Sequence, residues 1–156
     1  MRECWNFFRY ASLDNLQEVL SIINYNKIWF SHISTEHIKN KIENKECILE
    51  SGILITFKYV NKKSYLGDFL VKEGNTILEQ IARKDLSIKI SFAEHIFTKF
   101  INCAYGKVYL MVNVKNKRAI KFYGKMKMTK VCDTKLDKDK ERGFIFASPD
   151  RIVKNL

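Results

Sequence analysis

The chain has 156 residues, of which 46% are hydrophobic and 13% aromatic, and a formal net charge of +11. This length and apolar content are enough for one sizeable core, so we expect a single domain over residues 1–156. No stretch approaches the roughly 20 apolar residues of a membrane span. The first residues also lack the pattern of a signal peptide, so the sequence predicts a cytoplasmic protein without a membrane partner.

The first part of the chain predicts one strand and two helices. Residues 3–10 have the composition of a short strand. Ser12 or Asp14 can cap a helix over residues 13–23, where apolar side chains recur at helical spacing. Residues 33–45 predict a second helix, because Ser and Thr stand near its start as cap candidates.

Strand-forming residues then replace the helical period. Residues 47–60 are rich in apolar and β-branched side chains on both sides of Gly52, which predicts a strand with a bend or a hairpin at the glycine. Residues 65–74 and 76–84 predict two further strands, which a Gly-Asn turn joins.

The second half of the chain alternates helices and strands. Residues 91–106 predict a helix that Gly106 ends, and residues 107–113 predict a buried strand. The apolar stripe of the helix is formed by Phe92, Ile96, Phe97, Phe100 and Ile101. Residues 128–133 and 143–149 predict a hairpin with a charged, solvated connection.

Another helix, which follows the strand at 107–113, has two kinds of face. Ala119, Phe122 and Met126 form an apolar stripe that can hold the helix against a core. Asn116 and Tyr123 share a neighbouring face, two turns apart. With this helix the predicted order is β-α-α-β-β-β-α-β-α-β-β, which is an α/β fold with a mixed sheet.

This order and the last helix resemble the GNAT acyltransferase family. Family members carry a strand followed by Asn, two or three residues, Ala, two residues, Phe-Tyr, and then a Gly-Phe pair. Asn116, Ala119, Phe122 and Tyr123 match this pattern, and a Lys-Met pair stands where Gly-Phe is expected. Residues 77–85 look like the family's fourth strand.

The resemblance implies a site for acetyl-CoA. In the family the fourth and fifth strands splay apart at their ends, and the cofactor's pantetheine arm pairs with the exposed edge of the fourth strand. Here the backbone groups of Gln80, Ile81 and Ala82 would line the arm. The Asn116 amide would contact pantetheine, and the Tyr123 hydroxyl would lie near the cofactor's sulfur.

The implied chemistry is acyl transfer to an amine. The amine is protonated at neutral pH, so a base or a water chain must remove a proton before attack on the thioester. Glu79 is the candidate base, backbone N–H groups near Ile81 are candidate oxyanion donors, and Tyr123 is the candidate acid for the departing thiolate. The alternatives are a solvated strand residue for Glu79 and a core aromatic for Tyr123.

The expected pyrophosphate loop departs from the family pattern. Family members use a glycine-rich loop before the third helix, whereas residues 84–92 contain no glycine. Three interpretations remain open: the loop binds through its N–H groups with help from Ser87, Lys89 and Ser91, it binds weakly, or the fold persists without acyl-CoA chemistry.

The acceptor is open between a protein N-terminus, a lysine side chain and a small amine, and the alternative function is a basic GNAT-fold protein that binds or modifies nucleic acid. The sequence at residues 48–63 and the strands that follow it resemble the GNAT-like branch of phage DNA-modification proteins. The positive charge, with Trp29, Phe30 and Tyr65, fits stacking on bases. A lysine-rich composition and a core role for Trp29 and Phe30 explain the same residues.

No metal site is predicted. The cysteines have no CxxC or CxH spacing, which fits reduced thiols. They are Cys4, Cys47, Cys103 and Cys132. His32 and His37 are five residues apart and do not share a helical face, so we expect surface or capping roles for them and for His95.

Overall fold

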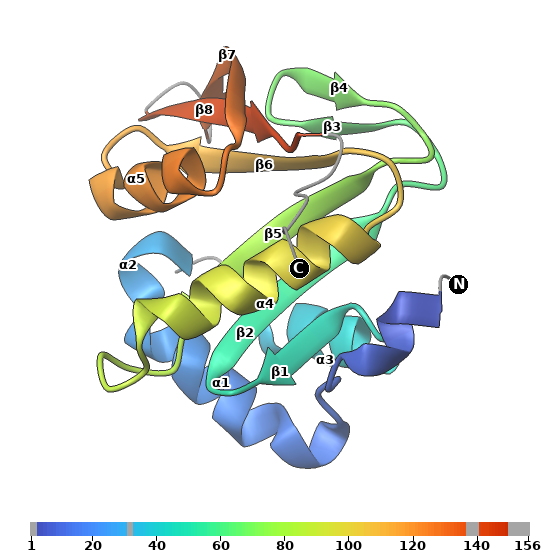
Figure 1. The fold of residues 1–156 in the computed structure, drawn as a ribbon, viewed down its shortest axis with the longest axis vertical. Helices are drawn as coiled ribbons and strands as arrows, with labels where there is room; N and C mark the ends of the chain where they lie inside the picture. Colours follow the sequence, from blue (N-terminus) through green and yellow to red (C-terminus); the bar gives the residue numbers. More distant parts are fainter. Residues whose placement is uncertain (1–2, 31–32, 137–140, 150–156) are drawn as a thin grey trace, which may run out of the picture. The chain divides into compact units, whose positions relative to one another are not determined.

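The computed structural model describes residues 3–30, 33–136 and 141–149. Within these residues the strands form a six-stranded sheet in the order β1-β2-β5-β6-β8-β7 and a separate two-stranded sheet, β3-β4 (Figure 1). The strands are β1 (Cys47–Glu50), β2 (Ile53–Tyr59), β3 (Ser64–Leu66), β4 (Phe69–Val71), β5 (Thr76–Arg83), β6 (Val108–Asn113), β7 (Thr129–Leu136) and β8 (Glu141–Ala147). The helices are α1 (Leu16–Tyr25), α2 (Lys27–Phe30), α3 (Thr35–Glu43), α4 (Ile90–Cys103) and α5 (Lys117–Lys125), and two 3₁₀ helices precede them, η1 (Glu3–Phe7) and η2 (Leu13–Asn15). The predicted α/β class with a mixed sheet is confirmed.

The chain divides into two compact units. Unit 1 comprises residues 1–58 and 78–99, and unit 2 comprises residues 59–77 and 100–156. The boundary therefore passes through β5 and α4.

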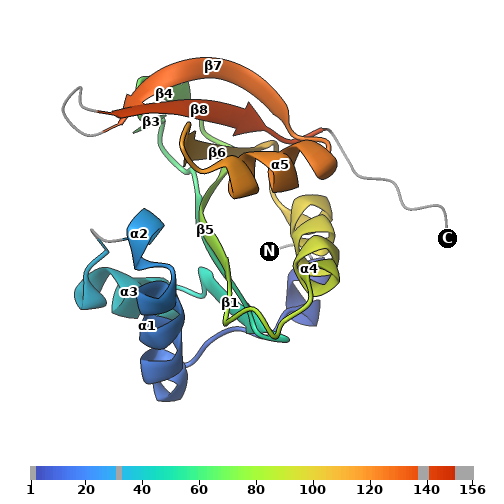
Figure 2. The same ribbon diagram turned by 90° about the vertical axis from the view of Figure 1, so that its left-hand side faces the viewer.

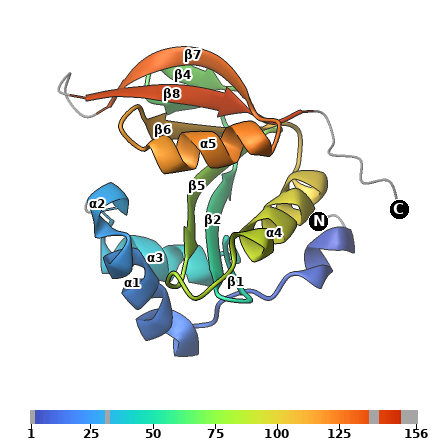
Figure 3. The same cartoon turned by 60° about the vertical axis from the view of Figure 1, so that its left-hand side comes forward.

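Unit 1 is built around the hairpin of β1 and β2. Ser51 and Gly52 connect the strands with φ angles of +52° and +77°, the left-handed conformations that tight hairpin turns use. The predicted hairpin at Gly52 is therefore confirmed. Figures 2 and 3 show α1 and α3 on one side of these strands and α4 on the other. The core on the α1 and α3 side includes Val19, Ile22, Ile38, Ile42, Leu49 and Leu54.

The predicted strand at residues 3–10 is wrong, because this segment begins with the 3₁₀ helix η1. Trp5 and Phe8 are both buried, and their three-residue spacing places them on one side of a helix with three residues per turn. Trp5 stacks on Phe57 with ring centroids 5.2 Å apart. The following residues 9–11 run along the outer edge of β1, where Ala11 N–H donates to the Cys47 carbonyl at 3.0 Å.

The two helices predicted in the first part of the chain are present. The first consists of η2 followed by α1. The second is α3, whose start is capped by the Ser34 hydroxyl, which accepts the His37 N–H at 3.1 Å. The sequence did not predict the one-turn helix α2, which contains Trp29 and Phe30.

Unit 2 contains β6, β8 and β7, with α5 on one side of these strands and the β3–β4 hairpin on the other (Figures 2 and 3). The single strand predicted over residues 65–74 is wrong, since Gly67 adopts a φ of +60° and turns the chain between β3 and β4. The hairpin is fixed to β7, because Asp68 N–H donates to Thr134 Oγ1 at 2.8 Å. The predicted final hairpin is present as β7 and β8, which extend into the expected charged loop. Residues 137–140 of that loop lie outside the described residues.

The buried stripes of α4 and α5 differ from the predictions, by one predicted residue in α4 and by two in α5. In α4 the four later members of the predicted stripe are buried, but Phe92 is 47% exposed and Ala93 is buried instead. In α5 Tyr123 and Met126 are buried, whereas Ala119 and Phe122 are half-buried. Adjacent helical residues are about 100° apart, so a small rotation of the helix exchanges such neighbours.

Two glycines in unit 2 give a matched stability prediction. Gly106 has a φ of +61°, and an added Cβ would collide with the backbone oxygen of Gly74. Gly106→Ala should therefore lower the free energy of unfolding by about 2 kcal/mol. Gly124, in α5, has open space around it, so Gly124→Ala should raise that free energy by about 1 kcal/mol through helix propensity. Urea unfolding of both variants checks the prediction, and shifts of the same sign would contradict it.

Candidate active site

The strand β5, which contains most of the predicted site residues, pairs only briefly with β6. The parallel register joins Thr76 to Val108 and Ile77 to Tyr109. β5 continues to Arg83 and β6 to Asn113, and no further pairing between them is present in the described strands. The ladder between β5 and β6, the expected fourth and fifth strands, therefore ends at Ile77 and Tyr109.

Glu79, the candidate base on β5, belongs to a charged cluster in unit 1. Its Oε2 lies 3.1 Å from His37 Nε2, and its Oε1 is ion-paired with Lys41 Nζ. The Glu79 side chain is 19% exposed. Glu79 is therefore a half-buried, hydrogen-bonded carboxylate and not a freely solvated strand residue.

Lys41 is the buried member of this cluster. Its side chain is only 7% exposed, and its Nζ donates to the Phe57 carbonyl at 2.8 Å and lies 3.5 Å from Glu46 Oε1. A buried ammonium needs such partners, because an unpaired charge in the interior is costly. Lys41 therefore holds the Glu79 carboxylate in position.

Sequence reasoning missed the role of His37 beside Glu79. Its backbone does contribute to the cap of α3, as the capping interpretation expects, but its side chain reaches β5. An ionised carboxylate only accepts hydrogen bonds, so the tautomer that fits this contact donates from Nε2 and has Nδ1 as an acceptor. His37 and Lys41 are four residues apart on α3, and this i, i+4 spacing was the signal that could have revealed the cluster.

The next three residues of β5 differ in their surroundings. Gln80 accepts a hydrogen bond from the Thr56 hydroxyl of the neighbouring strand β2. Ile81 is half-buried, and Ala82 is buried in the core of unit 1. Their side chains are thus occupied with β2 and the core, so only their backbone groups are suited to the role predicted for them.

The glycine-free loop before α4 is organised by Asp85. The Asp85 carboxylate accepts both the backbone N–H of Ser87, at 2.8 Å, and its hydroxyl. These hydrogen bonds lower the pKa of Asp85 below its ordinary value. The donors of Ser87 are therefore engaged, whereas Lys89 and Ser91 are exposed at the start of α4.

The two candidates in unit 2 are fixed by α5. Asn116 is the N-cap residue of α5, and its Oδ1 accepts the Ala119 N–H at 3.2 Å. Tyr123 is 7% exposed and packs beside Phe122 and Phe146, with ring centroids 5.7 and 6.1 Å away. Burial raises the pKa of Tyr123, so its phenol stays protonated at neutral pH. The core interpretation of its ring is correct, and its hydroxyl remains a candidate donor.

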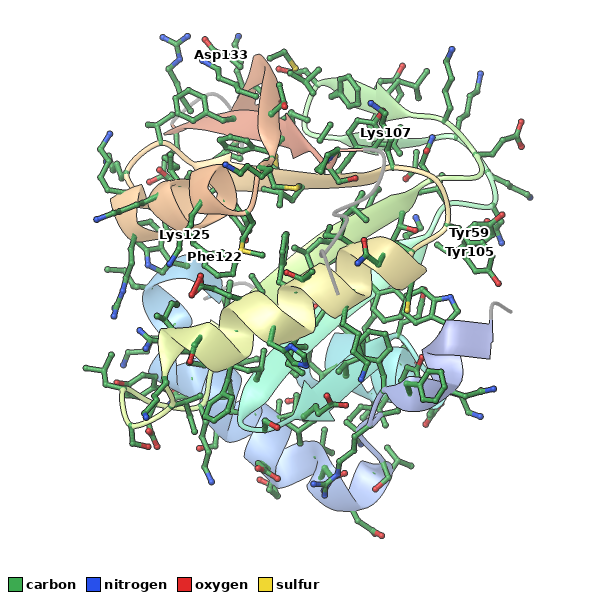
Figure 4. The ribbon with its side chains drawn as sticks, in the orientation of Figure 1. Tyr59, Tyr105, Lys107, Phe122, Lys125 and Asp133 are labelled. Carbon is green, nitrogen blue, oxygen red and sulfur yellow. The ribbon has the colours of Figure 1, made fainter. Side chains whose placement is uncertain are left out.

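The aromatic residues considered for base stacking lie in different units. In unit 1 Phe30 packs against the core and Trp29 is half-buried, as the core interpretation requires. In unit 2 Tyr65 is 71% exposed. Figure 4 shows two other tyrosines of this unit, Tyr59 and Tyr105, side by side, and their ring centroids are 5.1 Å apart.

Neither cysteines nor histidines gather into a metal site within the described part of the chain. Cys47 and Cys103 are buried, Cys132 is half-buried, and none of the three forms a disulfide bond. Burial raises the pKa of Cys47 to about 12, so it is an unreactive thiol at neutral pH. His95 is exposed on α4, and His32 lies outside the described residues.

No protein-family model and no curated protein matches this sequence. Solved structures do match it. A GNAT-family acetyltransferase from Bacillus cereus superimposes with a TM-score of 0.70 at 15% identity, over 92% of this chain and 96% of that one. The ribosomal-protein-S18-alanine N-acetyltransferase from Escherichia coli superimposes with a TM-score of 0.63 at 12% identity, over 95% of this chain and 96% of that one. Arabidopsis thaliana NAA60 in complex with a bisubstrate analogue superimposes with a TM-score of 0.63 at 14% identity, over 90% of this chain and 96% of that one.

The chain has the GNAT fold. The match over almost the full length of these structures confirms the resemblance that the helix motif and the element order predicted. The GNAT structures named here give no support to the closer resemblance to phage DNA-modification proteins. None of the helices in the described part of this GNAT fold has the length and hydropathy needed to cross a bilayer.

Proposed function

We propose that this protein is an acetyl-CoA-dependent N-acyltransferase. The observation that carries the proposal is the hydrogen-bonded pair of Glu79 and His37 on a GNAT fold, at a strand whose pairing with β6 ends after Ile77. An extended thioester arm can pair with an unpaired strand edge. A carboxylate and an imidazole beside that edge supply the proton acceptor that an amine nucleophile needs.

The reaction joins the amine nitrogen to the acetyl carbon and breaks the carbon–sulfur bond. The ammonium first loses a proton, and the neutral amine then attacks the thioester carbonyl. The tetrahedral oxyanion is stabilised by backbone N–H groups near Ile81, at about 3 kcal/mol for each well-aligned donor. Collapse of the intermediate expels the coenzyme A thiolate, which takes up one proton, so the products are an amide and the free thiol.

The proton from the amine passes to His37 in this proposal. His37 Nδ1 is the free acceptor, and the Glu79 carboxylate on Nε2 stabilises the imidazolium that forms. Lys41 holds the Glu79 carboxylate in place. In this proposal His37 is the base, and Glu79, which was predicted as the base, positions and stabilises the imidazole.

Tyr123 is the proposed donor to the leaving thiolate. A phenol whose pKa burial has raised is neutral and holds its proton firmly. We therefore expect it to donate a hydrogen bond to the thiolate, and solvent to supply the proton that finally forms the thiol.

The cofactor is proposed to bind through backbone and loop groups. The backbone of Gln80, Ile81 and Ala82 would pair with the pantetheine arm, and the Asn116 amide nitrogen would contact the same arm. For the pyrophosphate the proposed ligands are the exposed Lys89 and Ser91. Ser87 can join them only if its donors leave Asp85, so we expect weaker phosphate binding than a glycine-rich loop gives.

A thermal-denaturation titration with acetyl-CoA tests the donor. Stabilisation grows as RT ln(1 + [L]/Kd), so a hundredfold excess over Kd adds about 2.7 kcal/mol and raises Tm by several degrees. Release of coenzyme A thiol is then followed with spermidine, a lysine peptide and a peptide with a free N-terminal alanine. No shift in Tm and no thiol release with any of these amines would favour the alternative function, a GNAT-fold binding protein without acyl transfer.

Tyr123→Phe separates cofactor binding from turnover. Removal of the hydroxyl should lower kcat about tenfold, because the thiolate loses a hydrogen bond, whereas the Kd for acetyl-CoA should stay within twofold. Phe146→Leu is the control, since it changes the packing beside the Tyr123 ring and keeps the hydroxyl. Full turnover by Tyr123→Phe would remove Tyr123 from the mechanism.

A further inference from the structure

The positive charge of the protein belongs almost entirely to unit 2. Residues 59–77 and 100–156 contain 17 lysines and arginines and 7 acidic residues, whereas the remaining residues contain 11 and 10. Unit 1 is thus close to neutral, and unit 2 carries a net charge of +10. A lysine-rich composition spread over the whole chain does not produce such an imbalance.

Within unit 2 the charge is concentrated on and around α5. Residues 100–132 contain eight lysines and arginines and no aspartate or glutamate. Four of the nine residues of α5 are basic and exposed, and we call them the basic face: Lys117, Arg118, Lys121 and Lys125. Lys117, Lys121 and Lys125 follow each other at four-residue spacing, about 6 Å apart along the helix axis. Figure 4 labels Lys125 on this helix.

The basic face is unfavourable for the helix itself. Lys117 and Arg118 occupy the first turn, where the helix dipole favours acidic residues, and like charges four residues apart repel each other. No described carboxylate is ion-paired with Lys117, Arg118 or Lys121, and Asp133, the first acidic residue after α5 in the sequence, pairs with Lys130 and Arg142. A sequence that keeps such repulsion against local rules indicates an anionic partner.

We propose that the basic face binds the phosphate backbone of double-stranded nucleic acid. An anionic membrane fits less well, because interfacial helices insert large apolar side chains, and the buried side of α5 already uses Tyr123 and Met126 in the core. An acidic protein fits less well too, because the centres of protein interfaces are depleted in lysine. Rows of lysines without apolar neighbours are typical of contacts to phosphates.

Binding through this face is independent of nucleotide sequence. The aromatic residue next to it, Phe122, is half-buried against the ring of Tyr123 and does not offer a free stacking surface. Contacts to phosphate alone position a protein on a duplex but do not read bases. This inference goes beyond the proposed acyl transfer and does not depend on it.

Fluorescence anisotropy with a labelled 20-base-pair DNA duplex tests the proposal between 50 and 200 mM NaCl. The triple variant Lys117→Gln, Lys121→Gln and Lys125→Gln should bind at least tenfold more weakly at 100 mM salt. Its slope of log K against log[NaCl] should be smaller by about 2.7, since each lost phosphate contact removes about 0.9. Circular dichroism verifies that the variant is folded.

A second triple variant, Lys62→Gln, Lys63→Gln and Lys72→Gln, is the matched control. These three lysines are also exposed residues of unit 2, but they flank the β3–β4 hairpin. Their substitution removes the same charge as the first triple variant. The control should bind within about threefold of the wild type. Equal weakening in both variants would overturn the assignment to α5, and so would displacement of the duplex by acetyl-CoA, which would assign the face to the cofactor's phosphates. Preference for anionic vesicles over the duplex would overturn it as well.

Discussion

Glu79→Gln is expected to lower kcat about 100-fold and to leave the Kd for acetyl-CoA nearly unchanged. The neutral amide keeps the size of Glu79 but removes the charge that stabilises a protonated His37, and positioned acid–base groups contribute about 100-fold or more to rate. Steady-state release of coenzyme A thiol, with whichever amine the wild type accepts, measures the effect.

Two further variants make the Glu79 result specific. Glu46 is the other carboxylate beside Lys41, at 3.5 Å, and it does not contact His37 in the described structure, so Glu46→Gln should keep kcat within about threefold. His37→Gln should lower kcat about as much as Glu79→Gln, and the double variant should be little worse than either, because residues that act as a unit are not additive. Full activity of His37→Gln together with an inactive Glu79→Gln would assign the proton transfer to Glu79 without the imidazole.

Lys41→Met is expected to lower the free energy of unfolding by about 3 kcal/mol. The substitution leaves the carboxylate of Glu79 without its ammonium partner in a half-buried position, and removal of one member of a buried ion pair typically costs about 3 to 5 kcal/mol. We expect the lower end of this range of free energies because His37 still donates a hydrogen bond to Glu79. Urea unfolding followed by circular dichroism gives the value.

The double variant Lys41→Met with Glu79→Leu distinguishes a missing partner from lost packing. It removes both charges, so most of the lost stability should return. Lys99→Met is the matched single variant, because Lys99 also pairs with a carboxylate, Glu50, at 3.5 Å but is 26% exposed; it should cost less than about 1 kcal/mol. A double variant less stable than Lys41→Met would show that Glu79 does not need the lysine.

Local signals in the sequence were sufficient for most elements of the fold. Gly52 predicted the hairpin because only a few residues tolerate left-handed backbone angles, and the apolar period predicted α1, α3 and α4. Residues 3–10 were misread because Trp5 and Phe8 suit a strand as well as a 3₁₀ helix. The 3₁₀ helix is favoured over the strand because it lets Trp5 stack on Phe57. Phe57 is 52 residues away in the sequence, so no local pattern predicts this contact.

The site was predictable only in part. Glu79 and Tyr123 were predicted from the resemblance. The partners of Glu79 belong to α3, and motifs along the chain do not predict contacts between elements that are distant in sequence. The hydrogen bonds from Ser87 to Asp85 could have been predicted from the sequence, because an aspartate two residues before a serine readily accepts such local hydrogen bonds.

The short segment that precedes Ser12 covers the outer edge of β1. β1 is the outermost strand at one end of the six-stranded sheet, and the segment at 9–11 occupies its outward backbone groups, with Leu49 N–H donating to the Arg9 carbonyl at 3.0 Å. Without this cover β1 would present open amides and carbonyls, the template on which strands of other molecules assemble into aggregates. A truncated protein starting after residue 11 should therefore be prone to precipitation even where its core still folds.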